Sequence, residues 1–248
     1  MAQHLPWPLA AGRSPSPPPM PRLVPSVDAA RFTPAPSARD ELVRRRLGLG
    51  SGPLFLAVAG AEARRSTLVT LRAFHFASVA LPSAQLVLAG GATPLDRGAY
   101  RGEFDAVARS LGRMESARLR TVEAPSEADL PSLFRLATAL VFLAQGDGVG
   151  PVVLQALASG TPVICATGAP FDHYLGRTDA LRVDPADAVA LAAAMYRATD
   201  AATAARLRAA GLAASRLFTV AGPARHRPPQ LHPARERDAE AVPRAMAG

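Results

Sequence analysis

The feature that most limits the folds open to this sequence is a regular alternation of short apolar runs with longer amphipathic segments. The apolar runs have the length of buried strands, and they include PLFLAVAG, AQLVLAGG, ALVFLA and PVICA. Segments with helical spacing lie between them. In EFDAVARSLG, for example, Phe104, Val107 and Leu111 share one face and Gly112 ends the helix. Apolar strands that alternate with helices predict an α/β fold, a Rossmann-like parallel sheet with helices on both faces.

Local signals place further elements. In SARDELVRRRLGLG, Ser37 and Asp40 have the spacing of a capping box, and the final glycines end the helix. The helix in SEADLPSLFRLA is capped by Ser126 or Asp129, and the proline that follows favours Asp129 because proline fits the first helical turn. We also predict strands in LRTVEA and ALRVD, and helices in ADAVALAAAMYRAT and AATAARLRAAGLAASRLF. The helix in STLVTLRAFHFASVAL has an apolar face formed by Val69, Ala73, Phe76 and Ala80.

The composition argues against a nucleic-acid partner and against a membrane span. The formal net charge is +8, but the basic residues are scattered arginines without the interleaved aromatic residues of a single-strand binder. No apolar stretch is long enough to span a membrane, and the N-terminus lacks the apolar core of a signal peptide. The single cysteine, Cys165, lies in PVICA, where we expect a buried small hydrophobe. These features predict a cytoplasmic protein.

The distribution of proline predicts the domain boundaries. Residues 1–21 are rich in proline and serine, and residues 221–248 gain proline and charge while losing periodicity. We therefore expect both ends to be disordered. Residues 22–220 carry the alternation and are predicted to form one domain.

The loop AQGDGVG leads from a predicted strand into a predicted helix that begins near Pro151. The first N–H groups of a helix have no partners within it, and the helix dipole adds positive charge there. Glycines let the backbone approach a phosphate closely, so the loop can hold a diphosphate. A plain turn between two packed elements explains the same glycines equally well. A dinucleotide-binding loop is disfavoured, because the region about 20 residues further on, ICATGAP, lacks the acid that binds the ribose.

Many motifs in one order resemble the C-terminal half of GT-B-fold retaining glycosyltransferases of family 4, also called glycosyl transferases group 1. The resemblance covers about 200 residues, from RLVPSVDAARFTP to ASRLFT. It includes LGLG, the basic pair Arg64 and Arg65, LPSAQLVLAGG, DGVGPVVLQALASGTPV and VDPADAVALAAAM. It implies that the chain is half of a GT-B fold and binds a nucleotide-diphosphate sugar as its donor substrate.

The resemblance also implies roles for single residues. The basic pair and the glycine loop face the diphosphate, Gln155 binds the ribose, and Asp147 lies beside the sugar as the catalytic residue. No metal and no other cofactor are expected, because arginines and helix dipoles can stabilise a departing diphosphate. The donor-binding residues are therefore expected to be Gly60, Arg64, Arg65, Gly90, Gly91, Gly148, Val149, Gly150 and Gln155.

The sequence departs from the family pattern in ways that leave two functions open. Asp147 and Gln155 stand where the family has glutamates, and a glutamine binds a ribose hydroxyl more weakly than a carboxylate does. The family's acceptor-binding domain has no counterpart here, so we expect activity to need a separate acceptor-binding domain or subunit. One hypothesis is the donor-binding half of a glycosyltransferase. The alternative is a non-catalytic nucleotide-binding or protein-interaction module.

Overall fold

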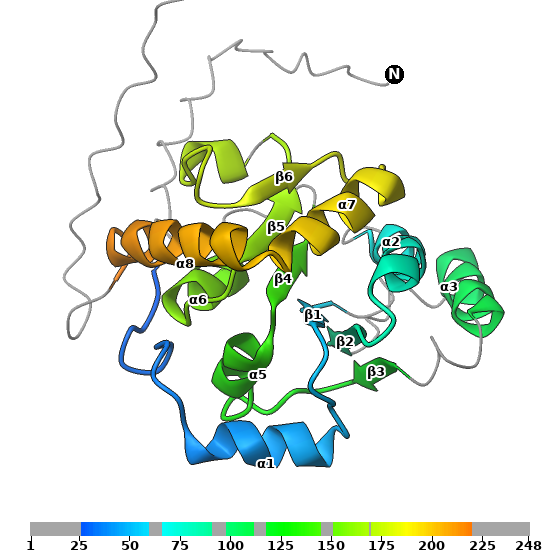
Figure 1. Cartoon of the computed structure of the whole chain (residues 1–248), viewed down its shortest axis with the longest axis horizontal. Coiled ribbons are helices and arrows are strands. Elements are labelled where there is room, and N and C mark those ends of the chain that lie inside the picture. The colour runs from blue at the N-terminus through cyan, green and yellow to red at the C-terminus, as the bar shows by residue number, and fades with distance from the viewer. Residues whose placement is uncertain are drawn as a thin grey trace, which may run out of the picture.

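The computed structural model describes residues 26–59, 66–90, 98–111, 118–144, 151–168 and 170–219, and in them strands alternate with helices as the sequence predicted (Figure 1). The strands are β1 (Leu54–Ala57), β2 (Gln85–Ala89), β3 (Leu119–Val122), β4 (Ala139–Phe142), β5 (Val163–Ala166) and β6 (Leu181–Val183). The helices are α1 (Ala38–Arg46), α2 (Thr67–Ala80), α3 (Ala99–Ser110), α5 (Leu130–Leu136), α6 (Pro151–Ala158), α7 (Ala188–Ala198) and α8 (Ala201–Arg216), with the short 3-10 helix η3 (Phe171–His173). The predicted tails, residues 1–21 and 221–248, lie outside the described residues.

The strands form one six-stranded sheet in the order β3-β2-β1-β4-β5-β6, and every pair of neighbours is parallel. The prediction of a Rossmann-like parallel sheet is therefore confirmed. Strands β1, β2, β4 and β5 are buried along their whole length. This burial explains why their sequences are apolar at every position except Gln85 of β2, instead of alternating.

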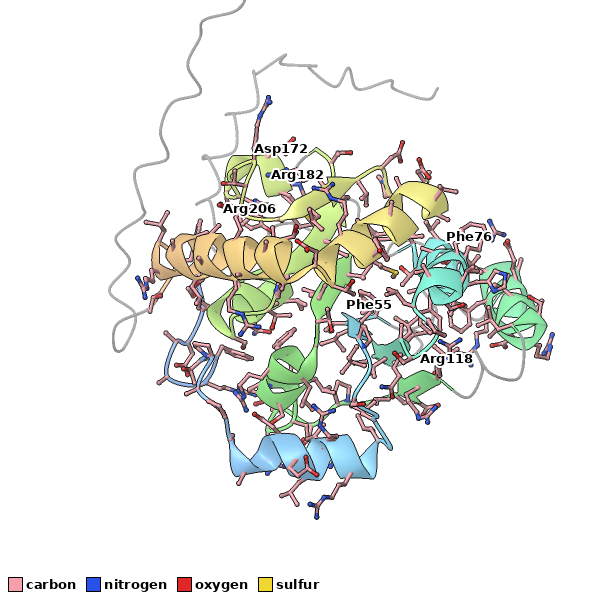
Figure 2. All side chains as sticks on the ribbon, in the orientation of Figure 1. Phe55, Phe76, Arg118, Asp172, Arg182 and Arg206 are labelled. Atoms are coloured by element: carbon pink, nitrogen blue, oxygen red, sulfur yellow. The ribbon has the colours of Figure 1, made fainter. Side chains whose placement is uncertain are left out.

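Helices cover both faces of the sheet, and successive residues of each strand point to opposite faces. In β1, Leu54 and Leu56 pack toward α1, α5 and α6, whereas Phe55 and Ala57 pack toward α2, α3 and α7. Figure 1 shows α5 and α6 on one side of the sheet and α2 and α3 on the other, and Figure 2 marks Phe55 in the sheet between them. Helix α8 packs mainly on α6.

Ion pairs of two carboxylates, half-buried Asp40 and buried Asp129, connect α1 to α5. The capping box of α1 forms as predicted. Its Asp40 also forms a bidentate ion pair with Arg135 of α5, in which Nη2 lies 2.6 Å from Oδ1 and Nε lies 2.9 Å from Oδ2. Asp129 stands at the start of α5 as predicted, but its carboxylate makes no cap. It bonds instead to Arg39 Nε at 2.8 Å and Arg46 Nη2 at 2.7 Å. Burial opposes ionisation of Asp129, yet these bonds and one from the Ser126 hydroxyl lower its pKa to about 2.

The predicted buried face of α2 is wrong. Of its four residues only Ala73 is buried; Val69 is half-buried, Phe76 is 47% exposed and Ala80 is exposed. Figure 2 marks Phe76 on α2. The residues that α2 turns to the sheet and α7 include Leu68, Leu71, Phe74 and Ala77. Apolar residues lie almost all round this helix, so its periodicity does not select one face.

The two ends of the described domain meet. Val27 forms a parallel bridge with Thr219, and its N–H donates to the carbonyl of Phe218 at 2.9 Å. Phe32 continues this segment into the core, where its ring lies 6.0 Å from that of Phe134 on α5. Residues 26–36 therefore form a strap that joins the end of α8 to α5.

Candidate functional site

The strand order creates one point where the sheet changes its direction of growth. From β1 the chain adds β2 and then β3 on one side, and then returns to add β4, β5 and β6 on the other. Strands β1 and β4 are therefore neighbours, with Phe55 paired to Ala139 and Leu56 to Leu140. Helix α2, which follows β1, lies on one face of the sheet, and helix α6, which follows β4, lies on the other. Open α/β sheets bind ligands in the crevice at such a point.

Most of the predicted site residues lie outside the described residues, in sequence segments that follow strands ending at this edge. Gly60, Arg64 and Arg65 follow β1, and Gly91 follows β2. The segment after β4, which the structure likewise does not describe, contains the predicted catalytic Asp147 and the glycine loop of Gly148, Val149 and Gly150. What the described residues establish is where these loops begin and end: at the carboxyl ends of adjacent parallel strands and at the helices that follow.

Gly90 is described and has an unusual backbone. Its φ is 157°, which favours glycine over residues with a Cβ. Its N–H donates to the carbonyl of Val122 at 2.9 Å and so extends the pairing of β2 with β3 by one residue. The glycine that the sequence placed at this edge therefore stands directly at the carboxyl end of β2.

Helix α6 begins at Pro151, as the sequence predicted, directly after the glycine loop. Because α6 follows β4, its N-terminus and the positive end of its dipole lie at the carboxyl edge of the sheet. Gln155 lies one turn into α6 and is half-buried, while Val153, Leu154 and Ala156 around it are buried. Gln155 is thus held on a rigid helix near the crevice.

Helix α2 begins at the same edge, on the other side of the switch between β1 and β4. Its N-cap residue, Ser66, has the left-handed angles φ 50° and ψ 40°, and its side chain makes no capping bond. The hydroxyl of Tyr100, on α3, takes that place: it accepts from Leu68 N–H at 2.9 Å and lies 3.1 Å from Thr67 Oγ1. Tyr100 was not among the predicted residues, because the helix predicted in EFDAVARSLG begins at Glu103, four residues after the true start at Ala99.

Beneath the carboxyl ends of β4 and β5 lies a row of aromatic rings. The ring centroids of Phe142 and Phe171 are 5.9 Å apart, those of Phe171 and Tyr174 are 6.0 Å apart, and those of Tyr174 and Phe218 are 6.0 Å apart. Burial raises the pKa of the Tyr174 hydroxyl, which has no hydrogen-bond partner within the described part of the chain. Cys165 is fully buried beside this row, as predicted, and burial raises its thiol pKa to about 12, so it is not a nucleophile at neutral pH.

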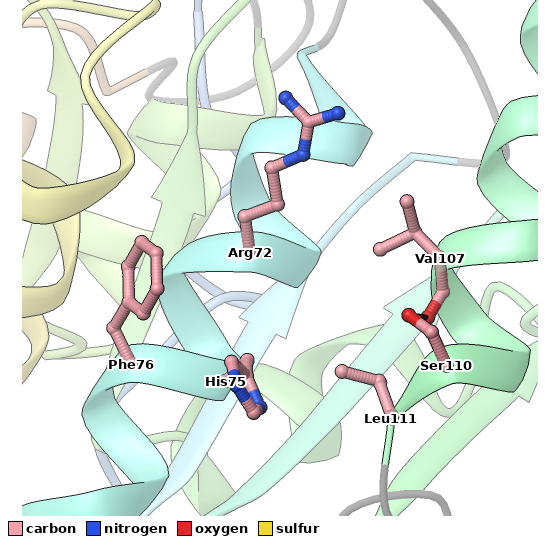
Figure 3. Close-up of a pocket in the computed structure, with 6 residues that line it drawn as sticks. All are labelled: Arg72, His75, Phe76, Val107, Ser110 and Leu111. Atoms are coloured by element: carbon pink, nitrogen blue, oxygen red, sulfur yellow. Dashed lines mark hydrogen bonds between the residues drawn. The ribbon is translucent and has the colours of Figure 1, made fainter.

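A pocket of about 180 Å³ opens between α2 and α3 (Figure 3). Its lining residues are Arg72, His75, Phe76, Val107, Ser110 and Leu111. They lie toward the C-terminal ends of both helices, which run back from the carboxyl edge of the sheet toward the amino edge. The pocket is also smaller than the roughly 300–1,000 Å³ usual for ligand sites. The pocket is therefore separate from the crevice at the carboxyl edge and is not the candidate ligand site.

The described ranges hold neither a metal-binding cluster nor a helix able to cross a membrane. They contain no group of three or more His, Cys, Asp or Glu residues that could hold a metal ion. No helix in the same ranges is long and apolar enough to cross a bilayer.

Comparison with known proteins agrees with this geometry. Residues 52–200 match the model of the family described as glycosyl transferases group 1. A D-inositol 3-phosphate glycosyltransferase of Salinispora arenicola is 34% identical over 57% of this chain, which spans only 33% of that relative.

Solved structures share the fold. The C-terminal domain of LpcC, a glycosyl transferase group 1 family protein of Francisella tularensis, superposes with a TM-score of 0.64 at 19% identity, covering 76% of this chain and 95% of that domain. Anabaena Alr3699/HepE in complex with UDP and glucose superposes with a TM-score of 0.68 at 17% identity, covering 78% of this chain and 51% of that one. At these identities the likeness concerns the fold alone.

Proposed function

Because this chain belongs to the glycosyl transferases group 1 family, we propose that it binds a nucleotide-sugar donor at the carboxyl edge of its sheet. The observation that carries the proposal is the strand order, which makes β1 and β4 neighbours. The loop after β1 contains Arg64 and Arg65, and the loop after β4 contains QGDGVG. Paired arginines and the N-terminus of a helix together suit a diphosphate, the common part of all such donors.

Each residue has a proposed role in donor binding. Arg64 and Arg65 pair with the diphosphate oxygens, and the glycine loop lets the N-terminus of α6 approach them. Gln155, half-buried one turn into α6, hydrogen-bonds a ribose hydroxyl. Asp147 lies beside the sugar as the catalytic carboxylate. Gly60, Gly90 and Gly91 line the crevice without side chains that would fill it.

The proposed reaction is sugar transfer with retention, as in family 4 of the retaining glycosyltransferases. The bond between the anomeric carbon of the sugar and the diphosphate breaks, and an acceptor hydroxyl loses its proton and bonds to the same carbon on the same face. The arginines and the helix dipole stabilise the negative charge on the departing diphosphate. This stabilisation needs no metal ion.

The chain is proposed to be the donor-binding half of such an enzyme. It spans a third of the D-inositol 3-phosphate glycosyltransferase that it matches. We assign donor binding to a domain at residues 22–220 and propose that a separate domain or subunit binds the acceptor. A cytoplasmic location is proposed from the single buried cysteine.

Calorimetric titration of the purified chain with UDP and with GDP tests the proposal. The Arg64→Ala/Arg65→Ala double variant should bind at least about tenfold more weakly, because it loses charge-assisted hydrogen bonds to phosphate. The matched control is Arg44→Ala/Arg45→Ala, which removes an equally basic pair from α1, a helix with no part in the proposed site. It should bind like the wild type.

A folded wild-type chain that binds neither nucleotide would contradict the proposal. The alternative, a non-catalytic protein-interaction module, would then lead, and the replacement of both family glutamates by Asp147 and Gln155 would be its explanation. An equal loss of nucleotide affinity in both double variants would mean that Arg64 and Arg65 contribute only through the overall positive charge of the chain.

A further inference from the structure

Tyr100 provides the cap that α2 lacks from its own sequence. A helix leaves its first N–H groups unpaired, and a Ser, Thr, Asp or Asn at the N-cap normally accepts from one of them. Ser66 holds the N-cap position of α2 but makes no such bond. The Tyr100 hydroxyl accepts from the N–H of Leu68 at 2.9 Å, and it also lies 3.1 Å from the hydroxyl of Thr67, with which it shares a hydrogen bond.

The turn that Tyr100 holds is strained. Ser66 is the one non-glycine residue with a positive φ in the described part of the chain, at 50°. A residue with a Cβ keeps this left-handed conformation only where its surroundings enforce it. Thr70 holds the turn from within the helix, because its N–H and its hydroxyl both donate to the Ser66 carbonyl, at 3.0 and 3.2 Å. Tyr100 holds it from the neighbouring helix.

The turn at Ser66 lies next to the proposed donor-binding arginines in the sequence. It follows β1 at the carboxyl edge of the sheet, and Arg64 and Arg65 directly precede it in the sequence. We propose that Tyr100 is a positioning residue for nucleotide binding: its hydroxyl fixes the start of α2, and thereby the point from which the arginine pair reaches the diphosphate. This role rests on the proposed function.

The hydroxyl can be removed without releasing α3 from α2. Further along the two helices, Arg72 Nη2 pairs with Glu103 Oε1 at 2.9 Å, and Phe104 is buried in the core on this face of the sheet. Tyr100 itself is half-buried. Tyr100→Phe therefore keeps the ring and the packing and removes only the cap.

The test compares Tyr100→Phe with Phe104→Leu in the full chain. Phe104→Leu also weakens the packing of α3 but keeps the hydroxyl. Titration with UDP and GDP measures affinity, and amide hydrogen exchange of residues 67–69 measures how well the start of α2 is held. We expect Tyr100→Phe to bind about three- to tenfold more weakly, as the loss of one hydrogen bond implies, and to exchange faster at Leu68. Phe104→Leu should lower the unfolding temperature while leaving the affinity at the wild-type value.

The outcomes separate the two proposals. A wild type that binds neither nucleotide would refute the proposed function and this role with it. A wild type that binds, together with an unchanged affinity in Tyr100→Phe, would refute the role of Tyr100 alone. An equal loss of affinity in Phe104→Leu would also refute it, because general loosening of α3 would then explain both results.

Discussion

Two glycines inside helices offer a direct test of the packing between α6 and α8. Gly102 lies in α3 and Gly211 in α8. Alanine is favoured over glycine in a helix interior by about 1 kcal/mol, so each Gly→Ala change carries the same intrinsic gain. A Cβ at Gly102 would meet nothing within 4 Å. Gly102→Ala should therefore raise the free energy of unfolding by about 0.5–1 kcal/mol.

At Gly211 the same methyl group has no room. It would lie 2.6 Å from Cδ2 of Leu157 on α6, and Leu157 is fully buried. Carbon atoms prefer separations of about 3.5–4.0 Å, so either α8 must move away from α6 or Leu157 must leave its rotamer. Overpacking of this kind costs about 1–3 kcal/mol. Set against the helical gain of about 1 kcal/mol, Gly211→Ala should lower the free energy of unfolding by roughly 0–2 kcal/mol.

Urea unfolding of the two variants and the wild type measures the difference, which should be about 1–3 kcal/mol in favour of Gly102→Ala. In a thermal scan each kcal/mol corresponds to a shift of about 2–4 °C for a domain of this size. If Gly211→Ala stabilises the protein as much as Gly102→Ala does, then Gly211 does not pack tightly against Leu157, and the predicted overpacking is refuted.

Three further predictions concern Asp129, Gly52 and Cys165. Asp129→Asn should lower the free energy of unfolding by about 1–3 kcal/mol at pH 7, because the carboxylate accepts charged hydrogen bonds. The folded-state pKa of Asp129 is lowered from 3.8 to about 2, so its contribution to stability is complete above about pH 5 and is lost as the pH falls through about 2. In urea titrations, the difference in free energy of unfolding between the wild type and Asp129→Asn should thus be smaller at pH 2.5 than at pH 7. An equal difference at both pH values would contradict the ion-pair explanation. Gly52→Ala should lower the free energy of unfolding by about 1–3 kcal/mol, because its Cβ would lie 2.0 Å from the backbone oxygen of Ser83. The control is Gly98→Ala, whose Cβ would have open space around it. Equal melting temperatures of the two variants would count against the close approach of Gly52 to Ser83. Cys165 should react with a thiol reagent only after unfolding, since it is buried and its pKa is raised to about 12; rapid labelling of the native protein would show otherwise.

The sequence by itself determined the elements of this protein and their class. Apolar runs such as ALVFLA became buried strands, the capping box at Ser37 started α1, and Pro151 started α6. Cys165 was correctly expected to be buried. These features depend on residues close together in the chain: local backbone preferences, hydrogen bonds within one turn, and the periodicity of apolar side chains. The resemblance to the glycosyltransferases likewise rested on local motifs in a fixed order, and the family match bears it out.

Only the tertiary structure decided the features that join distant segments. Periodicity predicted the wrong buried face for α2, because packing against the sheet and α7 buried Phe74 and left Phe76 exposed. Asp129 had the sequence of a helix cap, yet arginines 90 and 83 residues earlier in the chain bind its carboxylate. Tyr100 reaches α2 across 32 residues. Such contacts depend on which segments the sheet brings together, and the strand order that places β4 beside β1 is a property of the whole packed chain, encoded in no single segment.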